Sequence, residues 1–470
     1  EKMATKIPSA AGGGGRRARR ARRIPDSILN DPEIAAAASV LPDNYSFEIH
    51  KTIWKLREAE PPAKKVALQL PEGLLMFATV IGDIIERFTG AKFVVLGDVT
   101  YGACCVDDLT AKTIGCDFLV HYGHSCLVPV GITNGDNNKP DDKIGSTNTT
   151  IPIRTLYIFV EIAIDVQHII GCIQVNFGAH KEIPLTIMGT IQFTTALHEV
   201  AAALTKPSGN GNNNNDDDGS NKNGCFHDVI VPQGKPLSPG ETLGCTSPKL
   251  INNENNEPRQ GILIFIADGR FHLEAAMIHN PQLKAYRYDP YGKTLTSEKY
   301  DINKMKSSRQ YHISKSIHAK RWGIVLGTLG RQGNPAIFGH LRRLLKQKGC
   351  KTILVLLSEV FPAKLSLFKD VDVWVQVACP RLSIDWGDAF EKPLLTPYEA
   401  LVALKETEWR DVYPMDYYSD GSGPWTNQYH KNRNFNSLPK HEPPQPSVPA
   451  IQTTAATTTT TAAAAAAAMI

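Results

Sequence analysis

Three cysteines that are far apart in the chain stand in loops suited to binding a bulky ligand. They are Cys104, Cys245 and Cys379. Each lies in a polar, turn-rich stretch beside glycine or proline, so the backbone can approach a large object closely. Thiolates are soft ligands that suit iron–sulfur clusters, zinc or copper(I). Three thiolates around a four-iron cluster would leave one iron open to a small molecule.

The cysteine pattern alone leaves other interpretations open. The sequence has no Cys-x-x-Cys pair and no local cluster motif, so three unrelated buried thiols fit it too. Zinc is a further alternative, because many zinc sites use cysteine or histidine. The nine cysteines are odd in number and irregularly spaced. This argues against a secreted disulfide framework and for a reducing, cytoplasmic compartment.

A glycine-rich loop from Gly327 to Pro335 is a candidate anion site. It follows an apolar run and precedes a capped helix, so its glycines and the helix N-terminus could hold a carboxylate or phosphate. Gly330 and Arg331 are the candidate cofactor-binding residues within it. The loop has neither the dinucleotide fingerprint nor the P-loop lysine, so a tight structural turn is an equal alternative.

Another charged loop, from Asp268 to Glu274, also stands between a strand pattern and a helix pattern. Arg270 could grip a carboxylate with two hydrogen bonds, and Asp268 is the second cofactor-binding candidate here. A salt-bridged helix start explains the same residues, because acidic side chains favour helix N-termini. His124 follows a strand as well, but a lone histidine is more often structural than catalytic.

The elements that must position these loops alternate between strands and helices. Short continuous apolar runs are typical of parallel strands covered on both faces. They occur at Val66–Leu70, Phe93–Leu96, Phe118–His121, Leu156–Val160, Ile262–Ala267, Gly323–Leu326, Ile353–Leu357 and Val371–Val377. Helix starts are readable at Asp31–Pro32, at Asn334–Pro335 and at the capping box Thr396–Glu399. This alternation favours an α/β fold, in which ligands collect beyond the carboxyl ends of parallel strands.

Three blocks of strand–helix units, each with one of the three cysteines, predict three similar parallel-sheet α/β domains around a shared central site. We place them at residues 26–155, 156–295 and 296–405, with repetition in pattern rather than in residues. Residues 1–25 form a basic tail, residues 207–224 a low-complexity insertion in the second domain, and residues 406–470 an extension ending in a Pro/Thr/Ala tail.

Charge and hydropathy exclude several functions. The formal net charge is +4 over 470 residues, and a run of six arginines between Arg16 and Arg23 accounts for much of it. The rest is about neutral, so we expect no direct nucleic-acid binding. The arginine run leads into polar residues, so we expect no secretory leader. The most apolar stretch, residues 151–175, contains three charged residues and predicts buried strand and helix rather than a membrane span.

Nine ordered stretches together resemble the family of diphthamide-synthesis enzymes, the 2-(3-amino-3-carboxypropyl)histidine synthases. They are LQLPEGLL (in the 69–76 region), GDVTYGACCVDD (97–108), VHYGHSCLVP (120–129), KPLSPGETLGCTSP (235–248), DGRFHLEAAMI (268–278), YRYDPY (286–291), GTLGRQGNP (327–335), LSEVFPAKLSLF (357–368) and VACPRLSIDWG (377–387). The resemblance covers roughly residues 25 to 425. The insertion at 207–224 and the long block around 130–165 depart from the family pattern, but neither touches a cysteine stretch.

The resemblance implies a radical enzyme of an unusual kind. In this family one cysteine from each of three α/β domains holds a 4Fe-4S cluster, and the ligands match Cys104, Cys245 and Cys379. The Tyr-Gly-Ala-Cys context favours Cys104 over its neighbour Cys105. The open iron binds S-adenosylmethionine, the substrate. An electron from the reduced cluster releases a 3-amino-3-carboxypropyl radical, which adds to one histidine of translation elongation factor 2.

The resemblance also implies partners and a location. A homologous second subunit forms a heterodimer with this one, a small iron-containing protein donates electrons, and elongation factor 2 is the substrate, all in the cytoplasm without a membrane. The complete cysteine set implies that this chain is the catalytic subunit. A non-catalytic scaffold subunit of the same complex and a zinc-stabilised binding protein remain alternatives. The S-adenosylmethionine contacts do not carry over, so Asp268, Arg270, Gly330 and Arg331 are candidates from their strand-end positions only.

Overall fold

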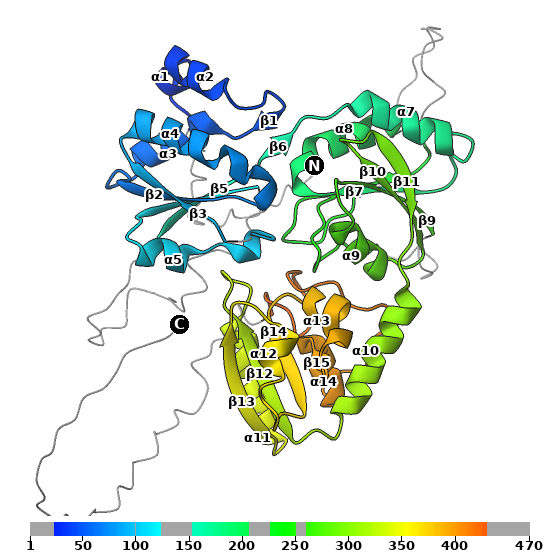
Figure 1. Cartoon of the computed structure of the whole chain (residues 1–470). Helices are drawn as coiled ribbons and strands as arrows, with labels where there is room; N and C mark the ends of the chain where they lie inside the picture. Colours follow the sequence, from blue (N-terminus) through cyan, green and yellow to red (C-terminus); the bar gives the residue numbers. More distant parts are fainter. Residues whose placement is uncertain (1–22, 99, 124–152, 206–225, 251–259, 430–470) are drawn as a thin grey trace, which may run out of the picture. The chain divides into compact units, whose positions relative to one another are not determined.

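Three helix-covered sheets make up the described part of the chain (Figure 1). The structure is a computed structural model, and it describes residues 23–98, 100–123, 153–205, 226–250 and 260–429. The unit Glu1–Lys431 is compact and contains all three sheets. The predicted α/β class with repeated sheet-centred domains is therefore confirmed. The arginine run, His124, the insertion at 207–224 and the Pro/Thr/Ala tail lie outside the described residues.

The first domain is built on a parallel sheet of order β3-β2-β4-β5. Its strands are β2 (Lys65–Gln69), β3 (Lys92–Leu96), β4 (Phe118–Tyr122) and β5 (Arg154–Ile158). Its helices are α1 (Asp26–Leu29), α2 (Pro32–Ala38), α3 (Ile49–Glu58), η1 (Glu72–Phe77), α4 (Ala78–Thr89), η2 (Ala103–Cys105) and α5 (Asp108–Thr113). Every residue of the central strand β4 is buried, as the continuous apolar run predicts.

The second domain has a five-stranded sheet of order β11-β10-β9-β7-β8. Its strands are β7 (Leu185–Gly189), β8 (Val229–Ile230), β9 (Gly261–Ile266), β10 (Leu283–Asp289) and β11 (Thr294–Glu298), and its helices are α7 (Val166–Phe177), η3 (Ile191–Phe193), α8 (Thr194–Leu204) and α9 (Phe271–His279). Four of these strands run parallel, as predicted, and β11 is the exception, because it runs antiparallel to β10. Asp289 explains the reversal: its Oδ1 accepts from the N–H groups of Tyr291 and Gly292 at 3.0 and 3.2 Å, which closes a hairpin turn.

The third domain has a parallel sheet of order β13-β12-β14-β15. Its strands are β12 (Arg321–Gly327), β13 (Lys351–Leu357), β14 (Val373–Val377) and β15 (Leu394–Leu395), and its helices are α10 (Ile302–Ser316), α11 (Pro335–Gln347), α12 (Pro362–Leu365), α13 (Arg381–Trp386), η4 (Gly387–Ala389) and α14 (Pro397–Ala403). Two expected helix starts are confirmed. Asn334 caps α11 with Pro335 at its first position, and Thr396 forms a capping box with Glu399 at the start of α14.

The first two sheets end slightly later in the chain than the predicted domain boundaries. β5 runs across the boundary at residue 155, and β11 runs across the one at residue 296. A two-stranded ribbon of β1 (Tyr45–Ser46) and β6 (Glu161–Ile162) joins the segments before and after the first sheet. The extension after residue 405 is not all tail. Its large side chains are buried in a hydrophobic core that the third domain shares with residues of the other two, and they are Tyr413, Met415, Tyr417, Tyr418 and Trp425.

A buried ion pair stands at the centre of the third domain. The Arg309 guanidinium donates to both Glu399 oxygens at 2.7 Å, and to the carbonyls of Ser383 and Leu394 at 2.7 Å. The two charged side chains are 1% and 0% exposed. Buried charges are tolerated only when paired and fully hydrogen-bonded, so this pair ties α10, α13, β15 and α14 together.

Replacing Arg309 by methionine should destabilise the third domain by about 3–5 kcal/mol, because the Glu399 carboxylate would remain buried without its cation. Hydrogen exchange of amides in β12 and β14 measures this change locally. Lys348→Met is the matched control: Lys348 pairs with Glu406 at 2.8 Å, with the side chains 41% and 39% exposed. Such a pair contributes about 0–1 kcal/mol. Similar losses in both variants would contradict the role given to Arg309.

Candidate metal centre

Cys104 lies in the short turn η2, beyond the carboxyl end of β3. Buried side chains at the ends of β2 and β4 hold this turn from within the first domain. Gln69 Nε2 donates to the Cys105 carbonyl at 2.8 Å, and Gln69 Oε1 lies 2.9 Å from His121 Nδ1. Because Gln69 and His121 are buried, these bonds take the place of water for the backbone of the turn.

The glycine-rich loop of the third domain holds the same turn from outside. The Arg331 N–H donates to the Cys104 carbonyl at 2.7 Å, and the Arg331 guanidinium makes two bonds of 2.7 Å to Asp108. Gly330 has a φ of 53°, and a Cβ atom there would lie 2.4 Å from the carbonyl carbon of Cys105. Glycine alone allows this approach. The contacts of Gly330 and Arg331 thus join the third domain to the first, and their role in binding a cofactor stays a prediction.

Cys245 lies at the tip of a tight turn in the second domain. Backbone hydrogen bonds of 2.8 and 3.2 Å connect Leu243 and Thr246 on either side of it. The segment that follows the third domain, around Tyr417, makes hydrogen bonds to this turn. The Tyr417 N–H donates to the Cys245 carbonyl at 3.3 Å, and the Tyr418 N–H donates to Thr246 Oγ1 at 3.0 Å. The position of Cys245 therefore depends on a chain segment far away in the sequence.

Cys379 follows β14, the strand predicted to end there, and precedes α13. Gln376, a buried residue of β14, donates from Nε2 to the Cys379 carbonyl at 2.9 Å and to Ser383 Oγ at 3.1 Å. These bonds fix the turn between strand and helix. A buried glutamine thus braces a cysteine turn in the third domain, as Gln69 does in the first.

Arg381 links this turn to the second domain. Its Nη1 donates to the carbonyls of Gly244 and Phe271, at 3.3 and 2.7 Å. Its side chain also pairs with Glu274 at 2.5 Å and with Asp385 at 2.8 Å. Burial alone would lower the pKa of Arg381, but the two carboxylates raise it above its usual range. A permanent positive charge therefore stands two residues from Cys379 and beside the Cys245 turn.

Hydrogen bonds link the three cysteine turns. Tyr417 donates to the Cys245 carbonyl at 3.3 Å and, through its hydroxyl, to the Gln332 carbonyl beside Arg331 at 3.5 Å. Arg381 connects the Cys379 turn to Gly244, next to Cys245.

A hydrogen bond with Cys105 and burial raise the pKa of Cys104, and the nearby Cys245 and Cys379 raise it further. Burial, together with Cys379, raises the pKa of Cys245 to about 12, and burial raises that of Cys379 to about 11. Each thiolate disfavours the others. A positive metal centre between them would reverse this repulsion, because coordinated thiols are held deprotonated.

The softness of these donors bears on the metal centre that they could hold. Within the described ranges, no three His, Cys, Asp or Glu side chains are placed to hold one metal ion. A zinc ion binds thiolate sulfur at about 2.3 Å, so its ligands must converge on one point. A four-iron cluster is a larger body that separates its cysteine ligands. Three soft thiols, one from each domain, therefore match the donor chemistry of an iron–sulfur cluster.

The aromatic segment beside the cysteines was missed by the sequence analysis, which placed it in the extension after residue 405. Tyr417 and Tyr418 meet edge to face with ring centroids 5.0 Å apart. Burial raises the pKa of both phenols, and the three cysteines add to the shift. The density of aromatic residues in Tyr413–Trp425 was the available signal, because a solvated tail rarely carries it.

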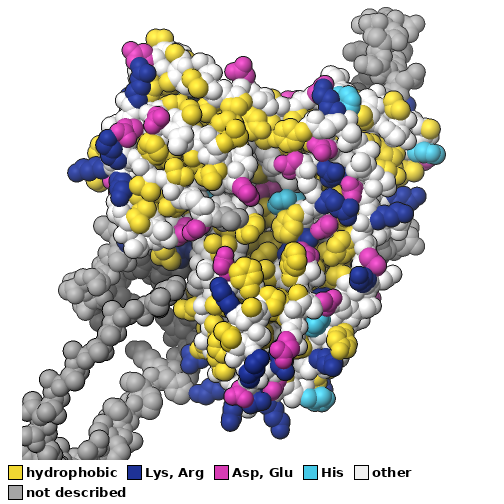
Figure 2. All heavy atoms as spheres, viewed as in Figure 1, with side chains coloured by type: hydrophobic (Ala, Val, Ile, Leu, Met, Phe, Trp, Pro, Cys, Tyr) yellow, Lys and Arg dark blue, Asp and Glu magenta, His cyan; other side chains and the backbone are white. Residues whose placement is uncertain are grey.

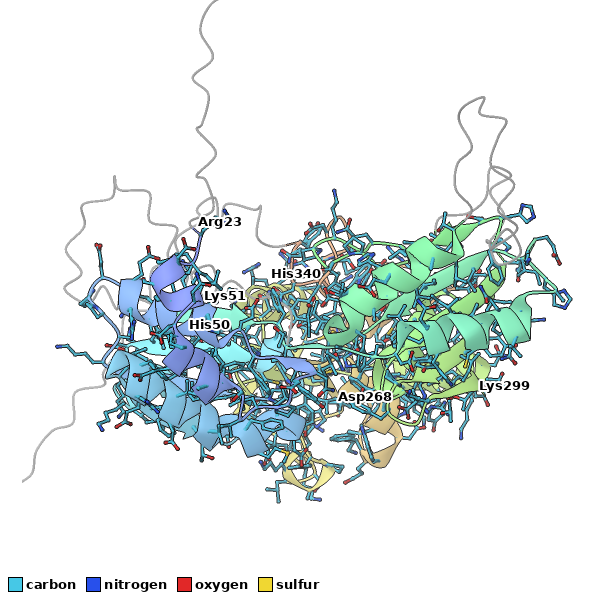
Figure 3. The ribbon with its side chains drawn as sticks, turned by 90° about the horizontal axis from the view of Figure 1, so that it is seen from above. Arg23, His50, Lys51, Asp268, Lys299 and His340 are labelled. Atoms are coloured by element: carbon cyan, nitrogen blue, oxygen red, sulfur yellow. The ribbon has the colours of Figure 1, made fainter. Side chains whose placement is uncertain are left out.

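The other two candidate residues lie in the loop after β9 (Figure 3 labels Asp268). Arg270 pairs with Glu298 at 3.0 Å and with Glu274 at 3.6 Å, and donates to the Lys299 carbonyl at 3.0 Å. Asp268 is exposed, and its carbonyl accepts from Arg287 at 3.3 Å. Neither bonds to the three cysteines within the described residues. Their contacts match a salt-bridged helix start, and a role in binding S-adenosylmethionine stays a prediction.

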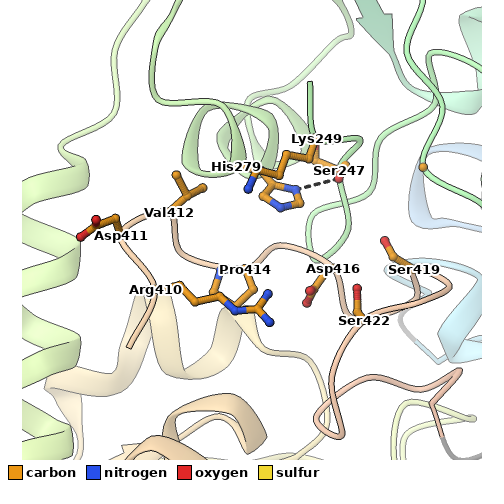
Figure 4. Close-up of a pocket in the computed structure, with 11 residues that line it drawn as sticks. Ser247, Lys249, His279, Arg410, Asp411, Val412, Pro414, Asp416, Ser419 and Ser422 are labelled. Carbon is orange, nitrogen blue, oxygen red and sulfur yellow. Dashed lines mark hydrogen bonds between the residues drawn. The ribbon is translucent and has the colours of Figure 1, made fainter. Parts of the chain in front are cut away.

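A cavity of about 600 Å³ lies next to the segment that follows Cys245 (Figure 4). Its lining includes Ser247, Lys249, His279, Arg410 and Asp416. His279 Nδ1 lies 2.8 Å from the Ser247 carbonyl, so the ring carries its proton on that nitrogen, and burial lowers the pKa of His279. The cavity is lined by none of the three cysteines, so it is separate from the candidate metal centre.

Comparison with known proteins identifies the family to which this chain belongs. A family model described as "Putative diphthamide synthesis protein" matches residues 70–414, which contain all three cysteines. The chain belongs to the diphthamide synthesis protein family. This finding confirms the resemblance seen in the nine stretches of sequence.

Relatives within the diphthamide synthesis family match nearly the whole chain. A chicken protein named "2-(3-amino-3-carboxypropyl)histidine synthase subunit 1" is 49% identical over 447 residues, covering 95% of this chain and 96% of the relative. The human protein of the same name is 48% identical over 437 residues, covering 93% and 88%. The crystal structure of Dph2 from Pyrococcus horikoshii with a 4Fe-4S cluster matches with a TM-score of 0.57 and 24% identity, covering 80% of this chain and 94% of that one. That match supports the repeated α/β fold.

Replacing Gly330 by alanine should loosen the Cys104 turn, because the added methyl group would overlap the Cys105 backbone. Hydrogen exchange of the Arg331 amide and of residues 103–108 should become faster. Gly349→Ala is the matched control: its φ is 74°, and an added Cβ there meets nothing within 4 Å. Both variants carry the cost of a left-handed backbone, about 1–2 kcal/mol. Unchanged hydrogen exchange of residues 103–108 in the Gly330 variant would contradict the proposed contact between the glycine-rich loop and the Cys104 turn.

Proposed function

We propose that this chain carries out the first step of diphthamide biosynthesis. It transfers the 3-amino-3-carboxypropyl group of S-adenosylmethionine to a histidine of translation elongation factor 2, by a radical mechanism at a 4Fe-4S cluster. The proposal rests on one observation: in this member of the diphthamide synthesis family, hydrogen bonds of Arg331, Tyr417 and Arg381 link the turns of three cysteines, one from each sheet domain. The names of its relatives, which are synthases, support the same assignment.

Cys104, Cys245 and Cys379 are the proposed cluster ligands. When bound, the cluster supplies a single electron to the sulfonium of S-adenosylmethionine. Three protein thiols leave the fourth iron for the substrate, so the chain's task is to hold the substrate with the correct carbon facing that iron. The joints made by Arg331 and Arg381 keep the three turns in place, since each one connects the loop of one cysteine to another domain.

The surroundings of the thiols suit a reactive intermediate. Tyr417 and Tyr418 are 4% and 2% exposed, so they limit access of water to the site. Their raised pKa values keep both phenols neutral at physiological pH. The single positive charge of Arg381 is paired with the carboxylates of Glu274 and Asp385. We therefore assign Arg381 the role of positioning the cysteine turns.

The proposal includes partners. The relatives are named as subunit 1, which supports a complex of more than one subunit. We infer a homologous second subunit forming a heterodimer, a small iron-containing protein as electron donor, and elongation factor 2 as the protein substrate. The seven described cysteines are free, which suits a reducing, cytoplasmic compartment. None of the described helices has the length and apolarity to cross a bilayer.

Cys245→Ser should remove the brown, oxygen-sensitive cluster and reduce transfer to background, because a hydroxyl is a poor ligand for iron in a cluster. The assay is anaerobic reconstitution with the second subunit, elongation factor 2, S-adenosylmethionine and a reductant. Mass spectrometry then detects one aminocarboxypropyl group on one histidine. Cys172→Ser, in helix α7 of the same domain, is the matched control and should retain cluster and activity.

The same samples discriminate the alternatives. Full transfer by the Cys245 variant would show that this chain is a scaffold for a catalytic partner. A colourless protein containing zinc in place of iron and sulfide would replace the enzyme proposal with that of a zinc-stabilised binding protein.

A further inference from the structure

Strand β13 forms one edge of the third sheet. It pairs in parallel with β12, and the described strands place nothing on its other side. Its last five residues, Ile353–Leu357, form a continuous apolar run of the kind found in strands that are covered on both faces and paired on both sides. An apolar edge strand with unpaired N–H and C=O groups is a ready template for another chain.

The apolar side chains around this edge are exposed to an unusual degree. Of the large exposed hydrophobic residues in the described chain, six gather between residues 353 and 368. They are Ile353 (40% exposed), Leu354 (39%), Leu356 (65%), Phe361 (50%), Leu367 (76%) and Phe368 (36%), and we call them the β13 surface. Figure 2 shows hydrophobic side chains gathered on the third domain. Exposed apolar groups of this density mark interaction sites.

The alternating direction of strand side chains decides what must cover this surface. Ile353 lies on one face of β13, while Leu354 and Leu356 lie on the other. A peptide or a single helix would cover one of the two faces. An occupant that extends the sheet with its own edge strand, and carries its own covering layers, would cover both faces and pair the free backbone groups.

The positive charges on helix α11, next to β13, indicate which charge the partner's surface should carry. Helix α11 packs against β12 and β13, and it exposes Arg342, Arg343 and Lys346, while Lys351 begins β13. Within the described residues these four cations form no ion pair. A second copy of this chain, pairing edge to edge about a two-fold axis, would bring the same cations together. An occupant with acidic residues flanking its edge strand is complementary.

We propose that the β13 surface is the docking site for the companion subunit of the complex, which adds an apolar edge strand to the third sheet and sets acidic side chains opposite the cations of α11. This inference rests on the part of the proposed function in which a homologous second subunit forms a heterodimer with this chain. It goes further, because it assigns the contact between the two subunits to one edge of the third sheet and states the chemistry of the partner's surface.

Leu356→Lys should weaken binding of the companion subunit at least about 30-fold, as expected at the centre of an interface. Leu356 is 65% exposed, so the substitution leaves the fold of this chain intact. Val175→Lys is the matched control: Val175 is an 87% exposed residue of α7 in the second domain, and its replacement should leave affinity unchanged. The affinity is measured by titrating the full chain with the companion subunit in biolayer interferometry.

A second pair of variants tests the charge rim. Replacing both Arg343 and Lys346 by glutamate should slow association and reduce its dependence on salt, because these cations steer an acidic partner. Lys284→Glu, an exposed charge reversal on β10, should leave association unchanged. Hydrogen exchange on the unaltered protein adds a readout that requires no substitution: amides of residues 351–357 should become protected when the companion subunit binds.

Three outcomes would overturn the inference. In the first, Leu356→Lys and Val175→Lys bind the companion subunit equally well, so docking occurs elsewhere. In the second, the chain alone has twice its monomer mass in sedimentation and Leu356→Lys abolishes this, so a second copy is the occupant. In the third, the unaltered chain binds no companion at all, and the proposal of a heterodimer fails with it. Iron and sulfide content, measured in the same samples, shows separately whether the cluster proposal stands.

Discussion

One short backbone contact joins two domains at the candidate site: the Arg331 N–H donates to the Cys104 carbonyl while Gly330 lies against the Cys105 backbone. It joins the loop at the end of one sheet to the loop at the end of another. No side chain fits between the two backbones, so the contact is either made at this distance or lost. The glycine-rich loop therefore supports the first cysteine turn, and its predicted role in binding a cofactor stays a prediction.

Buried arginines extend this principle through the molecule. Arg331 connects the third domain to Asp108 of the first, Arg381 connects it to backbone carbonyls of the second, and Arg309 ties the third domain together internally. The planar guanidinium suits this work, because it donates several hydrogen bonds in fixed directions and keeps its charge when buried. Each arginine donates hydrogen bonds to more than one oxygen atom that would otherwise lack a partner. The same side chain therefore both positions the backbone and balances the charge of nearby carboxylates. Such a framework can hold together three thiols whose thiolates would disfavour one another, until a metal centre stabilises the ionised form.

Local sequence signals predicted local structure well. The apolar runs at β2, β4, β9 and β12 became buried strands, and the caps at Asn334 and Thr396 began the expected helices. The failures share a physical cause. The β10–β11 hairpin depends on Asp289 binding the backbone of its own turn, a signal weaker than an apolar run. The aromatic segment after residue 405 has no helix or strand period, so its burial depends on a surface that other parts of the chain provide.

The sequence by itself determined the soft chemistry of three loop cysteines, the alternating α/β elements and, through the nine stretches, the family. These follow from residue type and near neighbours, which act over a few residues. Only the tertiary structure decided that the three thiols share a neighbourhood, that Gly330 and Arg331 form a joint, and that an apolar strand stands at a sheet edge. Such facts arise from contacts between residues hundreds of positions apart, and a local pattern contains no information on which distant backbone will arrive beside it.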